Sequence, residues 1–155
     1  MEERAKTDAI RFCGEVLASI LGNKDALEKC KGLRTRARSG ASQFMLYGYK
    51  GFMLFLLYKA DPKKLFDIYK LLKQGNYVQA AKQDTKENYA LYFALLLYIL
   101  SKFNTIKLDA VNNIEQFYRQ LTDQLFDERK EPELERCTAE AVIIMKYVFG
   151  SLPSK

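Results

Sequence analysis

Residues 29–59 read KCKGLRTRARSGASQFMLYGYKGFMLFLLYK, a segment that changes character halfway along. Its small and apolar side chains continue a pattern that starts just before it and recurs every three or four residues: Ala26, Cys30, Leu33, Ala37, Ala41 and Phe44. This spacing places them on one face of a helix, which we expect to begin at Asp25 and to end or bend at Ser39-Gly40. From Phe44 to Tyr58 only Lys50 is charged, so a second, largely buried helix is expected there.

Helical spacing continues upstream and downstream of this segment. The upstream helix has one apolar face, formed by Ala5, Ala9, Phe12, Val16 and Ile20. Gly22 then ends it, as glycine often does. Downstream, Asp61 and Pro62 are typical of a helix start, one as the capping residue and the other as the first helical residue. Gly75 closes that helix, and a short one is expected within residues 76–83.

The second half of the chain reads in the same way. Asp84-Thr-Lys-Glu87 resembles a capping box in front of a helix over residues 89–103. Apolar side chains then alternate steps of three and four, a pattern that packs against a neighbouring helix: Val111, Ile114, Tyr118, Leu121 and Leu125. Pro132 opens the last helix and Gly150 ends it. Because no stretch alternates with period two between turn signals, we predict an all-α fold, a compact bundle of about five to seven helices in one domain over residues 1–155.

The helix from Tyr89 to Leu100 is expected to be the most buried. Its only polar groups are tyrosine hydroxyls, so neighbours must cover it on nearly all sides. It is too short to cross a membrane, which takes about 20 apolar residues, and so is the run from Phe44 to Tyr58. The charged start of the chain, Met1 to Lys6, does not resemble a signal peptide. We therefore expect no membrane partner and a cytoplasmic location.

Few residues are available for catalysis or metal binding. The chain has no histidine, the commonest general base. The cysteines are too widely spaced for a zinc-ligand pattern and are interpreted as small buried residues: Cys13, Cys30 and Cys137. Asp123, Asp127 and Glu128 could hold a hard cation, although an exposed acidic face is the simpler interpretation. We expect no catalytic residue, metal or cofactor, and an enzyme that uses these carboxylates with a metal is the disfavoured alternative.

Positive charge is concentrated in the opening segment. The chain carries 25 Lys and Arg against 19 Asp and Glu, a net charge of +6. Seven of the basic residues and none of the acidic ones lie between Lys29 and Lys59, which leaves 18 basic and 19 acidic residues elsewhere. Charge localised in this way favours a polyanionic partner, because it raises the local potential and speeds encounter.

Six of these basic residues form the predicted nucleic-acid-binding set: Lys29, Lys31, Arg34, Arg36, Arg38 and Lys50. Helical geometry places Lys31, Arg34 and Arg38 along one flank of the apolar face, and Lys29 and Arg36 along the other. Arginine suits phosphate oxygens, and phosphate contacts position a nucleic acid without reading its sequence. A solvated helix face is the alternative, although a surface that serves solubility alone usually mixes both signs.

Three tyrosines of the same segment have two interpretations. Tyr47, Tyr49 and Tyr58 could stack on bases next to the basic residues. At helical spacing inside an apolar run they could equally belong to the core.

Two stretches carry a resemblance to a known family. The basic segment has Leu33, Ala37, Arg38, a turn-like step at Gly48, and Phe55 in an apolar helix that ends at Lys59. The last helix has Thr138-Ala139-Glu140-Ala141-Val142 followed by Tyr147. In both, the chain resembles the small α-helical subunit of the type III-B CRISPR effector, the Cmr RNA-targeting complex. It departs from that family's pattern at Tyr47, where Asn is usual, and at Phe149-Gly150, where basic residues are common.

The resemblance implies a non-catalytic role in antiviral defence. Such subunits stack into a filament along a ribonucleoprotein and cover the duplex of guide RNA and target RNA without reading its bases. The implied partners are the other effector subunits, guide RNA and target RNA, and the isolated chain is expected to be monomeric or weakly self-associated. Two alternatives remain open. One is a small subunit of another CRISPR effector, of the other type III or an archaeal type I; the other is a helical protein–protein adaptor with an acidic partner.

Overall fold

A computed structural model describes residues 3–110 and 112–153 and shows a single compact all-α domain. This part of the chain forms eight α-helices, one 3-10 turn and no strand. They are α1 (Glu3–Leu21), α2 (Lys24–Lys29), α3 (Gly32–Lys59), α4 (Pro62–Lys73), α5 (Tyr77–Lys82), α6 (Tyr89–Lys102), α7 (Ile114–Leu125), η1 (Glu128–Lys130) and α8 (Glu131–Phe149). Six of the α-helices are long, as expected, and α2 and α5 add two of six residues each.

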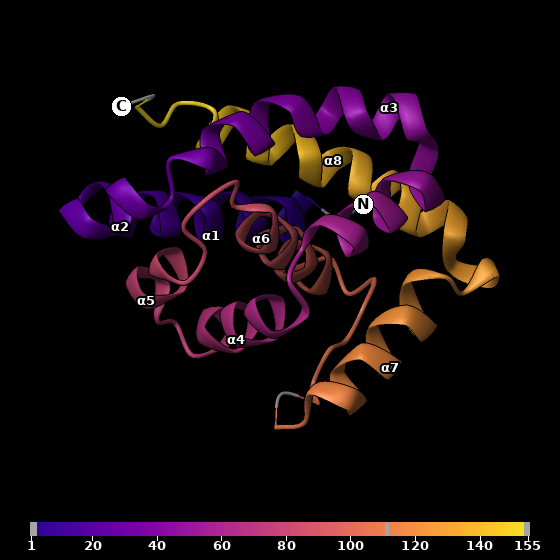
Figure 1. Cartoon of the computed structure of the whole chain (residues 1–155). Coiled ribbons are helices and arrows are strands. Elements are labelled where there is room, and N and C mark those ends of the chain that lie inside the picture. Colours follow the sequence, from indigo (N-terminus) through magenta and orange to yellow (C-terminus); the bar gives the residue numbers. More distant parts are fainter. Residues whose placement is uncertain (1–2, 111, 154–155) are drawn as a thin grey trace.

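Helix α6 lies at the centre of the bundle and contacts α1, α3, α4 and α8 (Figure 1). Every residue from Tyr89 to Leu97 is buried, as are Ile99 and Leu100. The prediction that this helix is the most buried is therefore confirmed. Neighbours surround it because it has no polar face to turn toward water. None of the described helices is both long and apolar enough to cross a membrane.

Helices α3 and α8 run antiparallel beside α6 (Figure 1). Arg38, early in α3, bonds to Gly150 just after the end of α8, whereas Lys50 further along α3 pairs with Glu131 at the start of α8. This register brings the beginning of the basic helix next to the C-terminal end of the chain's last helix, an adjacency that spacing alone does not reveal.

The bend in α3 lies at Gly48, and the expected end or bend at Ser39-Gly40 is wrong. Gly48 has φ 74° and ψ 174°, a backbone conformation that essentially only glycine adopts. Gly40 is helical, and its role is close packing: a Cβ at this position would overlap the hydroxyl of Tyr92 in α6. That hydroxyl is buried and has no hydrogen-bond partner among the described residues.

The helix expected from Asp25 is interrupted after Lys29, so α2 and α3 are separate. Asn88, fully buried and left-handed at φ 61°, holds the joint between them. Its side-chain oxygen accepts a hydrogen bond from the Gly32 backbone N–H (2.7 Å), and its amide nitrogen donates to the carbonyl oxygen of Lys29 (3.4 Å). A buried polar side chain thus fixes where the basic helix begins.

The capping box expected at residues 84–87 is wrong in detail. Asp84 does cap α6, but its carboxylate accepts directly from the backbone N–H groups of Ala90 (2.9 Å) and Leu91 (3.2 Å). The Asn88 side chain donates to the Asp84 carbonyl as well. Asp84 and Asn88 together anchor the start of α6 and the start of α3 to each other.

Helix α7 packs against α4, which confirms the predicted contact with a neighbouring helix, and Phe117 adds a buried residue that the pattern did not include. Phe117 is fully buried, and its ring lies 5.4 Å from Phe66 and 5.5 Å from Tyr69 between centroids. Ile114, expected on the buried face, is 40% exposed, and Val111 lies outside the described residues. Leu121 and Leu125 are fully buried, as the spacing predicts, so the predicted face is confirmed in the second half of α7 and is wrong at Ile114, where Phe117 takes the buried position.

All three cysteines are buried, as predicted. Burial raises the pKa of Cys13 to about 12 and that of Cys30 to about 11. Both thiols are therefore protonated near neutral pH and behave as small apolar side chains.

Candidate nucleic-acid interface

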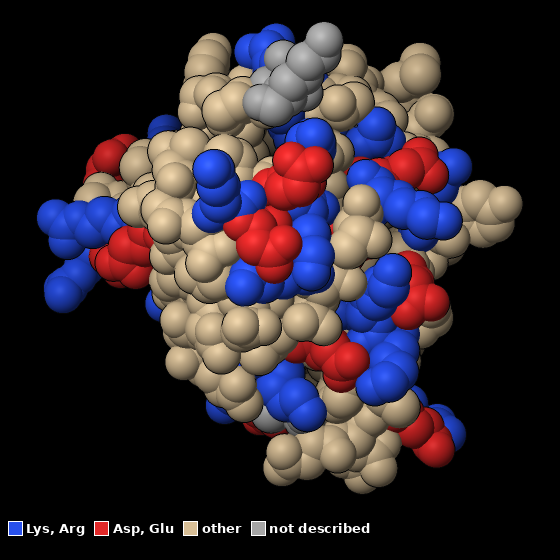
Figure 2. Space-filling view, turned by 60° about the vertical axis from the view of Figure 1, so that its left-hand side comes forward, with Lys and Arg blue, Asp and Glu red and all other residues tan. Residues whose placement is uncertain are grey.

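The six predicted binding residues occupy three different environments in the structure. Three lysines form ion pairs: Lys29 with Asp25 (3.4 Å), Lys31 with Glu28 (2.9 Å) and Lys50 with Glu131 (3.4 Å). Figure 2 brings forward the side of the molecule that carries α2, and on that face Lys and Arg lie beside Asp and Glu. Neighbouring carboxylates reduce the positive potential of these lysines, so this side of the predicted set is mixed in charge.

Arg36 lies on the opposite flank of α3 from Arg34 and Arg38, as helical geometry predicts. Its guanidinium carbon is 4.3 Å from the centroid of the Tyr89 ring. The amino group of Lys59, at the other end of α3, lies 5.5 Å from the centroid of the same ring. Arg36 is therefore held against an aromatic ring that Lys59 also approaches, apart from the other two arginines.

Arg34 and Arg38 share one surface. Spaced one helical turn apart, they line a shallow hollow together with Thr35 and Ser39. Neither arginine forms an ion pair with any carboxylate among residues 3–110 and 112–153. Both positive charges are thus available to an anion from outside.

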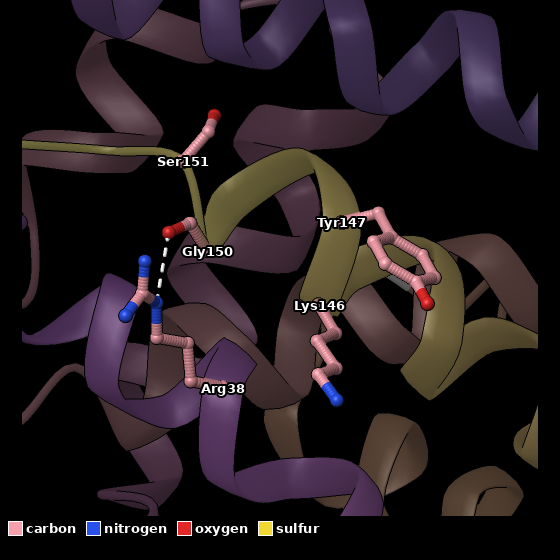
Figure 3. A pocket seen from close by; sticks show the side chains of 5 residues that line it. All are labelled: Arg38, Lys146, Tyr147, Gly150 and Ser151. Carbon is pink, nitrogen blue, oxygen red and sulfur yellow. Dashed lines mark hydrogen bonds between the residues drawn. The ribbon is translucent and has the colours of Figure 1, made fainter.

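Arg38 is also fixed in position by the end of α8. Its Nε donates a hydrogen bond to the carbonyl oxygen of Gly150 (2.9 Å; Figure 3). The last carbonyls of a helix lack partners within the helix, and a cation stabilises that end. Within the described part of the chain, the two terminal nitrogens of Arg38 make no hydrogen bond, so one edge of the guanidinium serves the fold while the other can bind a ligand.

A second hollow shares Arg38 and adds residues from the end of α8: Lys146, Tyr147, Gly150 and Ser151. Figure 3 shows these residues around the Arg38–Gly150 hydrogen bond. Tyr147 is 75% exposed, and Lys146 forms no ion pair with a described carboxylate. We name Arg34, Arg38, Lys146 and Tyr147 the α3–α8 basic surface.

The α3–α8 basic surface combines two kinds of group that bind single-stranded nucleic acid. Arginine and lysine bind phosphate oxygens, and an exposed tyrosine ring can stack on a base of any sequence. Sequence reasoning did not place Lys146 and Tyr147 in the binding set. In the sequence they are only a basic residue followed by an aromatic one on the last helix. Their relation to Arg38 becomes visible only because α8 lies beside α3.

The three tyrosines of the basic segment have different environments. Tyr49 is buried, and its hydroxyl donates to the Leu125 carbonyl oxygen (2.8 Å). Burial, and after it the charge of Glu131, raises the pKa of the Tyr49 hydroxyl above its usual value. Tyr47 and Tyr58 are exposed, so Tyr49 belongs to the core and the other two face solvent.

The acidic residues near the end of α7 are not arranged as metal ligands. No group of three or more Cys, Asp or Glu within the described ranges could hold a metal ion. Asp127 instead accepts hydrogen bonds from the backbone N–H of Arg129 (3.1 Å) and from its side chain (3.3 Å). These bonds lower the pKa of the Asp127 carboxyl below its usual value.

Comparison with known proteins adds no relative: no family model, curated protein or solved structure matches this chain.

Proposed function

We propose that this chain is a non-catalytic, RNA-binding small subunit of a type III CRISPR ribonucleoprotein effector. In this role it contacts the phosphate backbone of guide or target RNA through the α3–α8 basic surface and helps to assemble the complex. The observation that carries the proposal is a pair of hollows that share Arg38: one is also lined by Arg34, and the other by Lys146 and the exposed ring of Tyr147. None of the three cations is paired with a described carboxylate.

The residues that carry the sequence resemblance also build this surface. Leu33 and Ala37 form the buried face of α3, and Thr138 and Ala141 lie buried in α8. Ala37, Thr138 and Ala141 are small, which is compatible with the close contact between α3 and α8, and that contact brings Arg38 to the end of α8. The resemblance and the surface are therefore linked through the α3–α8 contact.

The arrangement also favours backbone binding over base reading. Arg38 is held by its bond to Gly150, so less side-chain freedom is lost when its terminal nitrogens bind a phosphate. The surface is an open hollow on two helices, without a deep pocket that could enclose a base. Such a site binds RNA largely independently of sequence.

The test is the salt dependence of RNA binding. We expect the wild-type chain to bind a single-stranded RNA with an affinity that falls steeply with salt. Arg34→Gln combined with Lys146→Gln should flatten the log–log salt slope by about 0.7 for each phosphate that is no longer neutralised, hence by roughly 1.4 if both side chains bind phosphate. Replacing Arg34 and Arg38 together by Glu, with Arg36 left unchanged against Tyr89, should likewise flatten it by roughly 1.4 units if both bind phosphate.

The matched control is Lys29→Gln with Lys31→Gln, which removes the same charge from ion-paired positions. We expect this pair to change the slope much less, and circular dichroism should show the same helix content in every variant. An equal flattening from both pairs would mean that net charge alone attracts RNA. No measurable binding of RNA by the wild-type chain, alone or with the other effector subunits, would contradict the proposal.

A further inference from the structure

An apolar groove lies on the outer side of α3, past its bend at Gly48. It is lined by Tyr47, Gly51, Leu54, Phe55 and Tyr58. Leu54 is 58% exposed and Tyr58 is 83% exposed, and two further exposed apolar residues, Met45 and Leu46, directly precede Tyr47. We name the five lining residues the α3 groove. Single exposed apolar side chains are common, whereas a cluster of this kind marks an interaction site.

The α3 groove has a positively charged end. The ring of Phe55 lies 5.4 Å from that of Tyr47 and 5.7 Å from that of Tyr89, between centroids. Arg36 and Lys59 both lie against the Tyr89 ring. Neither cation forms an ion pair with a carboxylate in the described ranges, so a row of aromatic rings leads from the apolar groove to two available positive charges.

We propose that the α3 groove binds an amphipathic helix of a partner protein, whose apolar side chains fill the groove and whose acidic residues meet Arg36 and Lys59. Past the bend, the lining residues recur at helical steps along one stripe, from Gly51 through Leu54 and Phe55 to Tyr58, and Tyr47 joins them from before the bend. Gly51 leaves a notch between larger side chains, which is the surface into which a ridge of a second helix packs. The helical part of the stripe extends roughly 10 Å, about two helical turns.

Charge selects the partner. Helix α3 contains no acidic residue, so every charge that α3 itself presents to a docked helix is positive. An acidic helix gains complementarity there, and a basic one is repelled. Single-stranded RNA fits less well, because Leu54 is aliphatic and offers no ring for stacking. The α3 groove shares no residue with the α3–α8 basic surface, so the two sites can be tested separately.

The experiment is a selection from a displayed library of helical peptides, with Leu, Ile or Phe fixed at positions i, i+3 and i+7 and all other positions randomised. On the wild-type chain we expect enriched peptides to carry more Glu and Asp than Lys and Arg, mainly toward one end. A selected peptide, synthesised and labelled, is then titrated against variants. Leu54→Asp and Tyr58→Ser should each weaken its binding about tenfold or more, equivalent to ~1.4 kcal/mol.

Lys59→Glu should remove the preference for acidic peptides while leaving the apolar pattern. Tyr147→Ser, at an equally exposed ring on the α3–α8 basic surface, is the matched control and should bind the peptide normally. Urea unfolding of each variant checks that the fold is intact.

Three outcomes would overturn the proposal. The first is no enrichment, or enriched peptides without excess acid. The second is binding that survives both Leu54→Asp and Tyr58→Ser. The third is loss of RNA binding or of self-association in those two variants, with no effect on peptide, which would assign the groove to RNA or to a second copy. Because RNA binding is scored separately with Arg34 and Lys146 variants, failure of one proposal leaves the other standing.

Discussion

The two halves of α3, before and after the bend at Gly48, differ both in the side chains that they bury and in the side chains that they expose. Before the bend, the inner face includes the small residues Ala37 and Gly40, with Gly40 packed against Tyr92 of α6, and the outer face is basic. After the bend, the inner face is large, with Phe52 and Met53 fully buried, and the outer face is apolar. One bent helix thus presents a surface suited to a polyanion and another suited to a protein.

The difference shows how packing distance sets what a helix can display. The first half approaches α6 so closely that a methyl group at Gly40 does not fit. Its close packing therefore depends on a position that has no side chain. The second half fills its surroundings with large rings, such as the edge-to-face pair of Phe52 and Phe44 at 5.7 Å. In the first half, a larger side chain at Gly40 should therefore destabilise the protein. In the second half, a smaller side chain at a buried ring should destabilise it.

The largest expected effect is in the second half. Phe52→Ala should lower the free energy of unfolding by about 3–5 kcal/mol, because it removes a fully buried ring and leaves a cavity. Leu54→Ala, two residues away but largely exposed, should change it by less than about 0.5 kcal/mol. Urea unfolding followed by circular dichroism measures both. Similar losses of stability in the two variants would show that the second half does not have distinct inner and outer faces.

A smaller loss is expected from adding volume to the first half. Gly40→Ala should cost roughly 1–3 kcal/mol, because the new methyl overlaps the Tyr92 hydroxyl. Tyr92→Phe alone should be nearly neutral, since that hydroxyl has no described partner. It should restore part of the stability of Gly40→Ala but not all of it, because the ring carbon Cζ would still lie 2.8 Å from the new Cβ. The double-mutant cycle is the sharpest measurement here. Additive changes in stability would mean that the two residues do not touch.

The smallest effect concerns the bend that separates the two halves. Gly48→Ala should destabilise by about 1 kcal/mol or somewhat more, because alanine is strained at φ 74° although nothing lies near its Cβ. Gly14→Ala is the matched control. It also has open space around the Cβ, but it sits in α1 without a positive φ, so it should stabilise by about 0.5–1 kcal/mol. If both substitutions stabilise the protein, α3 does not depend on the bend.

Much of the helical architecture could be predicted from local spacing. The burial of α6, the short helix α5, and the starts of α4 and α8 next to Pro62 and Pro132 follow from periodicity and capping residues alone. The errors fall where distant residues act on the backbone. Asn88, far along the chain, hydrogen-bonds to the carbonyl of Lys29, where the helix is interrupted. Gly40, which local rules predict to bend the helix, instead allows close contact with Tyr92.

The candidate site divides in the same way. Composition alone places the excess positive charge between Lys29 and Lys59, because charges can be counted without knowing their neighbours. Which of those charges are available depends on the folded chain. Lys29, Lys31 and Lys50 meet carboxylates, whereas Arg34 and Arg38 line one hollow without a described carboxylate partner, and Arg38 also lies beside the end of α8. The physical reason is that an ion pair or a shared surface depends on distance in space. Residues more than a hundred positions apart, Arg38 and Gly150, become neighbours only when α3 and α8 pack antiparallel.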